Sequence, residues 1–251
     1  MTDRWRIGAN LATLANGLLG VGAVLYTLAG NKLWAMLLVA IAIGFDGLDG
    51  ILSRRSRVPA RAFGRIADSV ADATTFGLAP AVMIAVHTGD VGIWQPYQSV
   101  AYLLAAVYFA AAIGRLVYFT ARAHALPYFL GVPTPESALA LVVALLFHDS
   151  PAFQSVQPVG LFTGVVLLSV LMVAPIPYPK IRKGSVLRWP MAVTAALAAV
   201  ALVPLQFRPP PGSALYLLAD VASLGLLVGV ASYYLLGPFT VRRVTPAPTD
   251  R

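Results

Sequence analysis

Long, mostly apolar stretches follow one another along almost the whole of this 251-residue chain. A helix needs about 20 such residues to cross the hydrocarbon core of a bilayer. Because open strands would leave backbone groups unpaired in lipid, we expect the stretches to be helices. The sequence predicts eight spans, at 10–30, 33–53, 64–88, 94–120, 134–149, 156–174, 187–207 and 214–236.

Composition agrees with an all-α membrane bundle. Hydrophobic residues make up 59% of the chain and charged residues 11%, whereas soluble domains carry about 25% charged residues. So few charges cannot cover a water-facing surface, which excludes soluble enzymes and nucleic-acid-binding proteins. The chain has no cysteine, which excludes disulfides and thiol chemistry.

The basic residues predict the orientation of the spans. With eight spans both termini lie on one side of the membrane, and of the 18 Lys and Arg residues only Lys32 and Arg208 fall on the other side. Positive residues collect on the cytoplasmic side of membrane proteins. We therefore expect cytoplasmic termini, and the net charge of +8 reflects orientation rather than nucleic-acid binding.

Four aspartates interrupt two neighbouring spans, in the stretch FDGLDGILSRRSRVPARAFGRIADSVAD. Asp46 and Asp49 are at i and i+3, and Asp68 and Asp72 at i and i+4, so each pair shares one helix face. A charge at the centre of a bilayer costs about 2.5–3.5 kcal/mol. Divalent cations that prefer oxygen ligands, such as Mg²⁺, Mn²⁺ or Ca²⁺, would remove the repulsion between the carboxylates.

Two interpretations of these aspartates are open at this point, an ion-transport site and a site for metal-assisted transfer of a phosphoryl group. Gly50 and Gly64 each lie one helical turn from an aspartate and would let a bulky ligand approach the backbone. Arg54 would supply a planar fork that matches a phosphate. These neighbours favour phosphoryl-group transfer.

The same residues resemble a known signature. The CDP-alcohol phosphotransferases carry the pattern D-x-x-D-G-x-x-A-R-x(8)-G-x-x-x-D-x-x-x-D, and the chain from Asp46 to Asp72 is similar to it. Ser53 stands where alanine is usual, and nine residues rather than eight separate Arg54 from Gly64.

Further stretches are similar to the class I phosphatidylserine synthases of this family. They are Ala9–Gly20, Phe76–Pro80, Tyr128–Pro135 and Met172–Lys180, so the resemblance covers about 9–183. Two places depart from it. Glu136 and Ser137 stand where small apolar residues are usual, and Gly114–Val117 matches an arginine-rich stretch only in part.

The resemblance implies one membrane domain, 1–251, with a six-helix catalytic core at about 9–183 and a C-terminal helix pair at about 187–237. The implied reaction transfers the phosphatidyl group of CDP-diacylglycerol to L-serine and releases CMP. The alternatives are another acceptor, inositol phosphate or glycerol phosphate, or a cation transporter. A homodimer with its active site on the cytoplasmic side is also implied.

The resemblance also implies roles for individual residues. Two divalent cations, Mg²⁺ or Mn²⁺ with Ca²⁺ also suited to the site, would be held by Asp46, Asp49, Asp68 and Asp72. Asp68 and Asp72 are the catalytic candidates, with Asp72 as general base. The nucleotide would contact Asp49, Gly50, Ser53, Arg54 and Gly64.

The carboxylate of serine needs a cation on the cytoplasmic side. Arg115, Lys180 and Arg182 are the candidates, and each of them equally suits a topology charge at the interface. Thr13 and Asn16 on the first span either face the nucleotide or form hydrogen bonds between helices.

Overall fold

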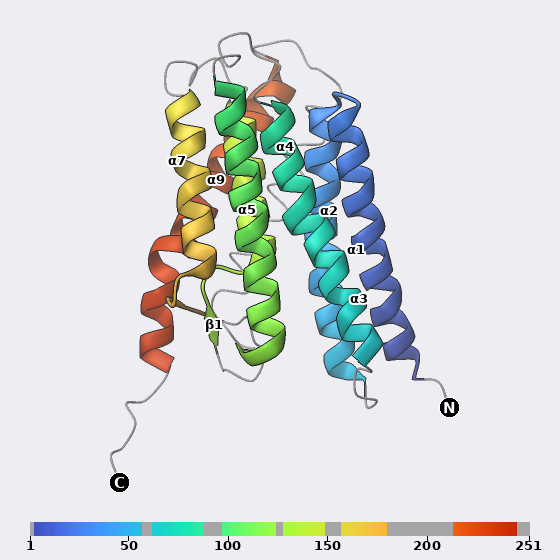
Figure 1. Ribbon diagram of the computed structural model, residues 1–251. Coiled ribbons are helices and arrows are strands. Elements are labelled where there is room, and N and C mark those ends of the chain that lie inside the picture. Colours follow the sequence, from blue (N-terminus) through green and yellow to red (C-terminus); the bar gives the residue numbers. More distant parts are fainter. Residues whose placement is uncertain are drawn as a thin grey trace.

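The computed structural model describes residues 3–56, 62–87, 97–123, 128–148, 157–179 and 213–244. These residues form a bundle of helices in which α1 begins and α9 ends at the same end of the molecule (Figure 1). The helices are α1 (Arg4–Leu28), α2 (Lys32–Arg55), α3 (Ala62–Asp72), the π-helix η1 (Ala73–Leu78), α4 (Ala79–His87), α5 (Gln98–Tyr118), the π-helix η3 (Phe119–Ala123), α6 (Thr134–His148), α7 (Gln157–Val173) and α9 (Ala214–Val244).

Within the described ranges, five helices are long and apolar enough to cross a membrane, and the prediction of an all-α membrane bundle is confirmed. They are Arg4–Leu28, Lys32–Arg55, Phe63–Val86, Gln98–Ala121 and Val221–Val241. Two shorter apolar helices, Thr134–Leu146 and Val159–Val173, coincide with the expected spans 134–149 and 156–174. The expected span 187–207 lies outside the described residues, so the total of eight stays a prediction.

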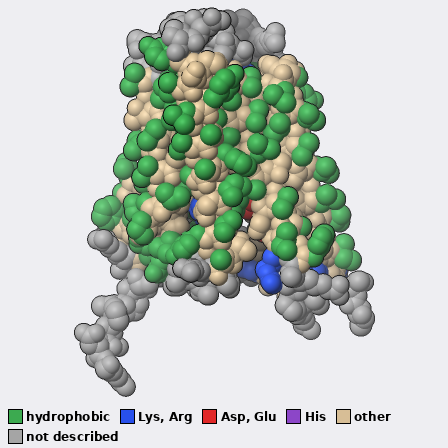
Figure 2. Space-filling view, in the orientation of Figure 1, with side chains coloured by type: hydrophobic (Ala, Val, Ile, Leu, Met, Phe, Trp, Pro, Cys, Tyr) green, Lys and Arg blue, Asp and Glu red, His purple; other side chains and the backbone are tan. Residues whose placement is uncertain are grey.

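The surface agrees with a membrane location. Figure 2 shows hydrophobic side chains spread over most of the visible face, while Lys and Arg side chains gather at its lower end. Many large apolar side chains on α1 and α9 are exposed, among them Leu11, Leu18 and Leu235. A patch of this extent on a soluble monomer would be an aggregation hazard, whereas in a bilayer it contacts lipid.

The third span is one continuous helix with a π-helical stretch in its middle. α3 passes into η1 directly after Asp72, and η1 passes into α4. π-Helical turns are rare in proteins overall, but those that occur often lie at functional sites. The last aspartate of the signature therefore stands where the helical geometry changes.

α1 packs against this third span through small residues. A Cβ atom placed on Gly20 would lie 2.8 Å from the Cα atom of Thr75, and one on Gly17 would lie 3.4 Å from the Cβ of Ala71. Carbon atoms in contact are normally about 3.5–4.0 Å apart. The close approach of α1 to η1 thus depends on the missing side chain of Gly20.

The apolar core lies among α2, α4, α5, α6 and α7 and includes Met36, Met83 and Leu141, none of which is exposed. Tyr108 is also completely buried. Its hydroxyl group donates a hydrogen bond of 3.2 Å to the carbonyl oxygen of Phe76. This bond satisfies the one polar atom of the tyrosine inside the core.

Two short strands connect the lower ends of the helices. β1 (Tyr128–Leu130) pairs antiparallel with β2 (Pro177–Pro179), and Phe129 lies opposite Tyr178. Gly131 follows β1 with a φ of 71°, a conformation that side chains disfavour. Its N–H donates to the carbonyl oxygen of Ile176 at 2.9 Å. The pair thereby ties the start of α6 to the end of α7.

The last helix is longer than expected. The expected span ends at 236, but α9 continues through Pro238 to Val244, so the predicted end is wrong. A proline inside a helix leaves the carbonyl four residues earlier without its donor. Here the hydroxyl group of Tyr178 donates to that carbonyl, on Tyr234, at 3.5 Å. A hydrogen bond from β2 thus replaces the one that Pro238 cannot make.

Candidate active site

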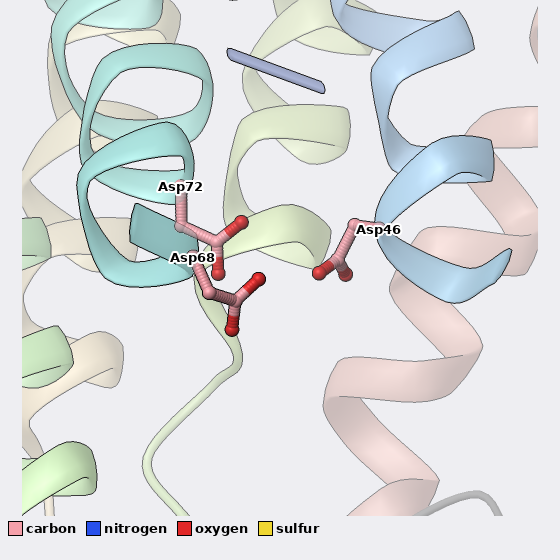
Figure 3. Close-up of side chains that lie close together, drawn as sticks. All are labelled: Asp46, Asp68 and Asp72. Atoms are coloured by element: carbon pink, nitrogen blue, oxygen red, sulfur yellow. The ribbon is translucent and has the colours of Figure 1, made fainter. Parts of the chain in front are cut away.

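The aspartates of the signature face one another across a gap between α2 and α3. Figure 3 shows the side chains of Asp68 and Asp72, both from α3, pointing toward Asp46 on α2. One carboxylate oxygen from each of the three lies within 4.8 Å of the others, and all three residues are half-buried. Three oxygen ligands at this spacing form a group that can hold a divalent cation.

The fourth aspartate, Asp49, lies beside this group and is bound by hydroxyl groups. Thr13 on α1 donates a hydrogen bond to one carboxylate oxygen, and Ser53 donates to the other at 3.0 Å. The carboxyl group also lies within hydrogen-bonding reach of Asp68. Asp49 is 8% exposed. The structure thus brings all four aspartates together, with three of them converging on one position.

Asn16 on α1 holds the last aspartate. Its side-chain N–H donates to Asp72 at 2.9 Å, and its backbone carbonyl accepts a hydrogen bond of 2.8 Å from Thr75. The residue is 1% exposed, and its side-chain oxygen has no hydrogen-bond partner within the described ranges. Of the two alternatives for Thr13 and Asn16, the structure provides hydrogen bonds between helices, and both bonds end on aspartates of the signature.

Because they have no side chains, the glycines of the signature do not cover the backbone beside the carboxylates. Within the described ranges, and outside the backbone of its own helix, no atom lies within 4 Å of a Cβ placed on Gly64, and a Cβ on Gly50 would meet only the guanidinium group of Arg54, at 3.4 Å. Arg54 itself is exposed at the end of α2. Ser53 accepts a hydrogen bond of 3.5 Å from Arg6. Of the described side chains, Arg54 is the one that a phosphate-bearing ligand approaching Gly50 would meet.

Arg115, at the end of α5, is carried into the interior of the bundle. It is 6% exposed, and one guanidinium nitrogen donates a hydrogen bond of 2.8 Å to Thr134 on α6. The guanidinium carbon lies 5.6 Å from the ring centre of Phe119 and 5.7 Å from that of Phe129. Arginine binds aromatic faces in this way when it is desolvated.

The positive charge of Arg115 acts on the aspartate group. Arg115 is near enough to Asp46 and Asp72 for their charges to interact. The two other candidates for binding the acceptor, Lys180 and Arg182, lie outside the described residues. Of the three acceptor candidates, Arg115 is accordingly the one that lies within the described residues.

Sequence reasoning gave no role to two residues near Arg115. Glu136, in the first turn of α6, and Tyr233, on α9, both interact electrostatically with the guanidinium group. Glu136 is the only glutamate of the chain and departs from the family pattern, which was the available signal. No sequence motif around Tyr233 predicts a role for it, because its position near Arg115 depends on how α9 packs.

Comparison with known sequences agrees with this geometry. The sequence model of the CDP-alcohol phosphatidyltransferase family matches residues 6–204. The chain belongs to this family. It is therefore a transferase of phospholipid synthesis that lies in the membrane as a multi-pass protein, and the resemblance of the aspartate signature is confirmed.

Several curated relatives carry more specific names. A CDP-diacylglycerol–serine O-phosphatidyltransferase of Helicobacter pylori is 30% identical over 177 residues, which cover 69% of this chain and 72% of the relative. The enzyme of the same name from Bacillus subtilis is 29% identical over 176 residues, covering 69% and 90%. An archaetidylserine synthase of Methanothermobacter thermautotrophicus is 26% identical over 173 residues, covering 68% and 69%.

Proposed function

We propose that the protein transfers the phosphatidyl group of CDP-diacylglycerol to L-serine and releases CMP. The observation that carries this proposal is the convergence of Asp46, Asp68 and Asp72 between α2 and α3. It occurs in a chain that belongs to the CDP-alcohol phosphatidyltransferases and resembles relatives named as serine transferases.

Two divalent cations, Mg²⁺ or Mn²⁺, would be held by the four aspartates, and Ca²⁺ also suits their oxygens. Bound cations would neutralise the diphosphate and the phosphate of the departing CMP. The donor set fits this role, because Asp46, Asp68 and Asp72 each offer a carboxylate oxygen to one position. Without cations, these carboxylates would repel one another.

The nucleotide would lie along the end of α2 and the start of α3. Gly50 and Gly64 leave room for it, and Asp49 and Ser53 stand beside this room as hydrogen-bonding groups. Arg54 is exposed and free to swing from Gly50 toward a phosphate, which its planar fork matches. In this arrangement the cytidine part enters from the end of the bundle where the basic side chains gather (Figure 2).

The reaction is a displacement at the phosphorus of the phosphatidyl group. The hydroxyl oxygen of serine forms a bond to this phosphorus, and the bond from phosphorus to the CMP oxygen breaks, so CMP leaves with the electron pair. Asp72 accepts the hydroxyl proton as general base. Asn16 donates to one oxygen of Asp72 and so orients the other toward the acceptor.

Serine brings a carboxylate, and Arg115 is the group that we assign to it. Arg115 is buried within electrostatic reach of Asp72, so a carboxylate bound to it would hold the serine hydroxyl near the general base. Lys180 and Arg182 would add positive charge at the mouth of the site. The catalytic core at about 9–183, the cytoplasmic site and the homodimer belong to this same proposal.

The experiment is an assay of CMP release from CDP-diacylglycerol by the purified protein with Mg²⁺ or Mn²⁺. Serine, glycerol phosphate and inositol phosphate are supplied separately at saturation. We expect the fastest release with serine and none without an acceptor. Faster release with glycerol phosphate or inositol phosphate would show that this compound, and not serine, is the acceptor. Metal-dependent ion flux in liposomes without CMP release would instead establish a cation transporter.

A further inference from the structure

Glu136 is an acid in an unusual place. It lies in the first turn of α6, and its Oε2 atom is buried with no hydrogen-bond partner among the described residues, although part of the side chain remains accessible. A buried carboxylate oxygen without a partner is costly to keep. The structure keeps this cost next to a buried cation, Arg115.

A second unpartnered atom of opposite character lies nearby. The Nε atom of Arg115 is buried and has no hydrogen-bond acceptor in the part of the chain that the structure describes, although Thr134 accepts from Nη1. The charges of Arg115 and Glu136 attract each other. The site therefore holds one unused donor on a cation and one unused acceptor on an anion, from two different helices.

The wall beside this pair comes from α9. Tyr233 is 8% exposed, and its ring stacks on Tyr178 of β2 with 5.6 Å between the ring centres. The hydroxyl group of Tyr234 donates to the backbone carbonyl of Glu136 at 3.4 Å. α9 lies beyond residues 6–204, which match the family model.

We propose that Arg115 and Glu136 form a subsite for an α-amino acid zwitterion, in which Arg115 binds the carboxylate and Glu136 binds the ammonium group. The subsite rests on the proposed function, because it gives the acceptor of that reaction its specificity. Tyr233 closes the subsite on the side of α9.

This pairing selects among acceptors by charge. A serine molecule supplies an acceptor for the guanidinium group and a donor for the carboxylate, so both unpartnered atoms gain a partner. Glycerol phosphate and inositol phosphate bring only negative charge, which Glu136 repels at close range. Ethanolamine lacks the carboxylate, and glycerate, which is serine with a hydroxyl in place of the ammonium, lacks the cation.

The test compares serine, glycerate and ethanolamine as acceptors in the CMP-release assay, with CDP-diacylglycerol at saturation. Loss of a charge-assisted hydrogen bond corresponds to about a 10- to 150-fold loss in affinity for the acceptor. We expect kcat/KM of the unaltered protein to be at least about 10-fold higher for serine than for either analogue. Glu136→Gln should lower kcat/KM for serine by that factor and leave the value for glycerate unchanged or raised.

Arg115→Gln should have the complementary effect and lower kcat/KM for serine and glycerate but not for ethanolamine. Ser169→Ala is the matched control, because the buried Ser169 hydroxyl donates to the backbone carbonyl of Val165 within α7, away from the subsite. It should lower the stability of the protein without changing the ratio of kcat/KM for serine to kcat/KM for glycerate.

The outcomes separate this subsite from the reaction itself. If the unaltered protein uses serine but Glu136→Gln changes kcat/KM for serine and for glycerate equally, Glu136 has only a structural role and the proposed subsite is wrong. If Glu136→Gln does not fold, equal use of serine and glycerate by the unaltered protein also refutes the subsite. If the unaltered protein prefers glycerol phosphate to serine, the proposed function fails and the subsite fails with it.

Discussion

The packing of α1 on η1 predicts that a single methyl group at position 20 impairs catalysis from a distance. In Gly20→Ala, the new Cβ atom would lie 2.8 Å from the Cα of Thr75. Because a carbon–carbon contact needs about 3.5 Å, the two helices must separate by roughly 0.7 Å at this point. Overpacking of this kind costs about 1–3 kcal/mol of stability.

The separation reaches the general base through a short chain of bonds. It stretches the 2.8 Å hydrogen bond from Thr75 to the carbonyl of Asn16 past the normal range of about 2.5–3.0 Å. Asn16 then loosens its hold on Asp72, which it now contacts at 2.9 Å. Misplacing a reacting group by about 1 Å costs on the order of 100-fold in rate, so we expect kcat to fall by about 10- to 100-fold.

The assay measures kcat for CMP release together with the melting temperature of the protein in detergent. Gly164→Ala on α7 is the matched control, because no atom of the other described elements lies within 4 Å of a Cβ at that position, and it should keep both values. A Gly20→Ala protein that melts and turns over like the unaltered one would refute the reasoning, since α1 would then not be held in place by this contact.

Three further predictions concern the site and the topology. Asp72→Asn should abolish CMP release while binding of CMP, measured by calorimetry in Mg²⁺ or Mn²⁺, largely survives; retained turnover would remove Asp72 as the general base. Arg54→Ala should raise KM for CDP-diacylglycerol by about 10-fold or more, the loss of one charge-assisted contact, and leave KM for serine unchanged, whereas the opposite pattern would move Arg54 to the acceptor. Cysteines introduced at Ser56 and Ser185 should react with an impermeant reagent from the cytoplasmic side, and one at Ser155 from the other side; reaction of Ser56 and Ser155 from the same side would contradict the orientation.

The parts of this protein that could be predicted from sequence are those encoded over a few neighbouring residues. The spans follow from runs of apolar residues, and the convergence of Asp68 with Asp72 follows from their spacing on one helix face. The facing of Asp46 toward them needed only a short connection between two antiparallel helices. In each case local periodicity was sufficient.

The parts that could not be predicted depend on how each helix is rotated against a distant one. Asn16 meets Asp72 because Gly20 lets α1 approach η1, and no local pattern encodes that rotation. The extension of α9 through Pro238 depends on Tyr178, which lies 60 residues earlier. A proline is an ordinary stop signal, and only a contact from another element overrides it.

The π-helical stretch after Asp72 has a consequence for how the third span is phased. An α-helix fixes the angle between any two of its residues, so turning one half of a span turns the other half with it. The wider hydrogen-bonding step of η1, from i to i+5, absorbs extra chain length at this point. Asp68 and Asp72 can therefore face Asp46 while Phe76 and Met83 face the core. Within one uninterrupted helix, the direction of the two carboxylates is thereby set separately from the direction of the apolar side chains.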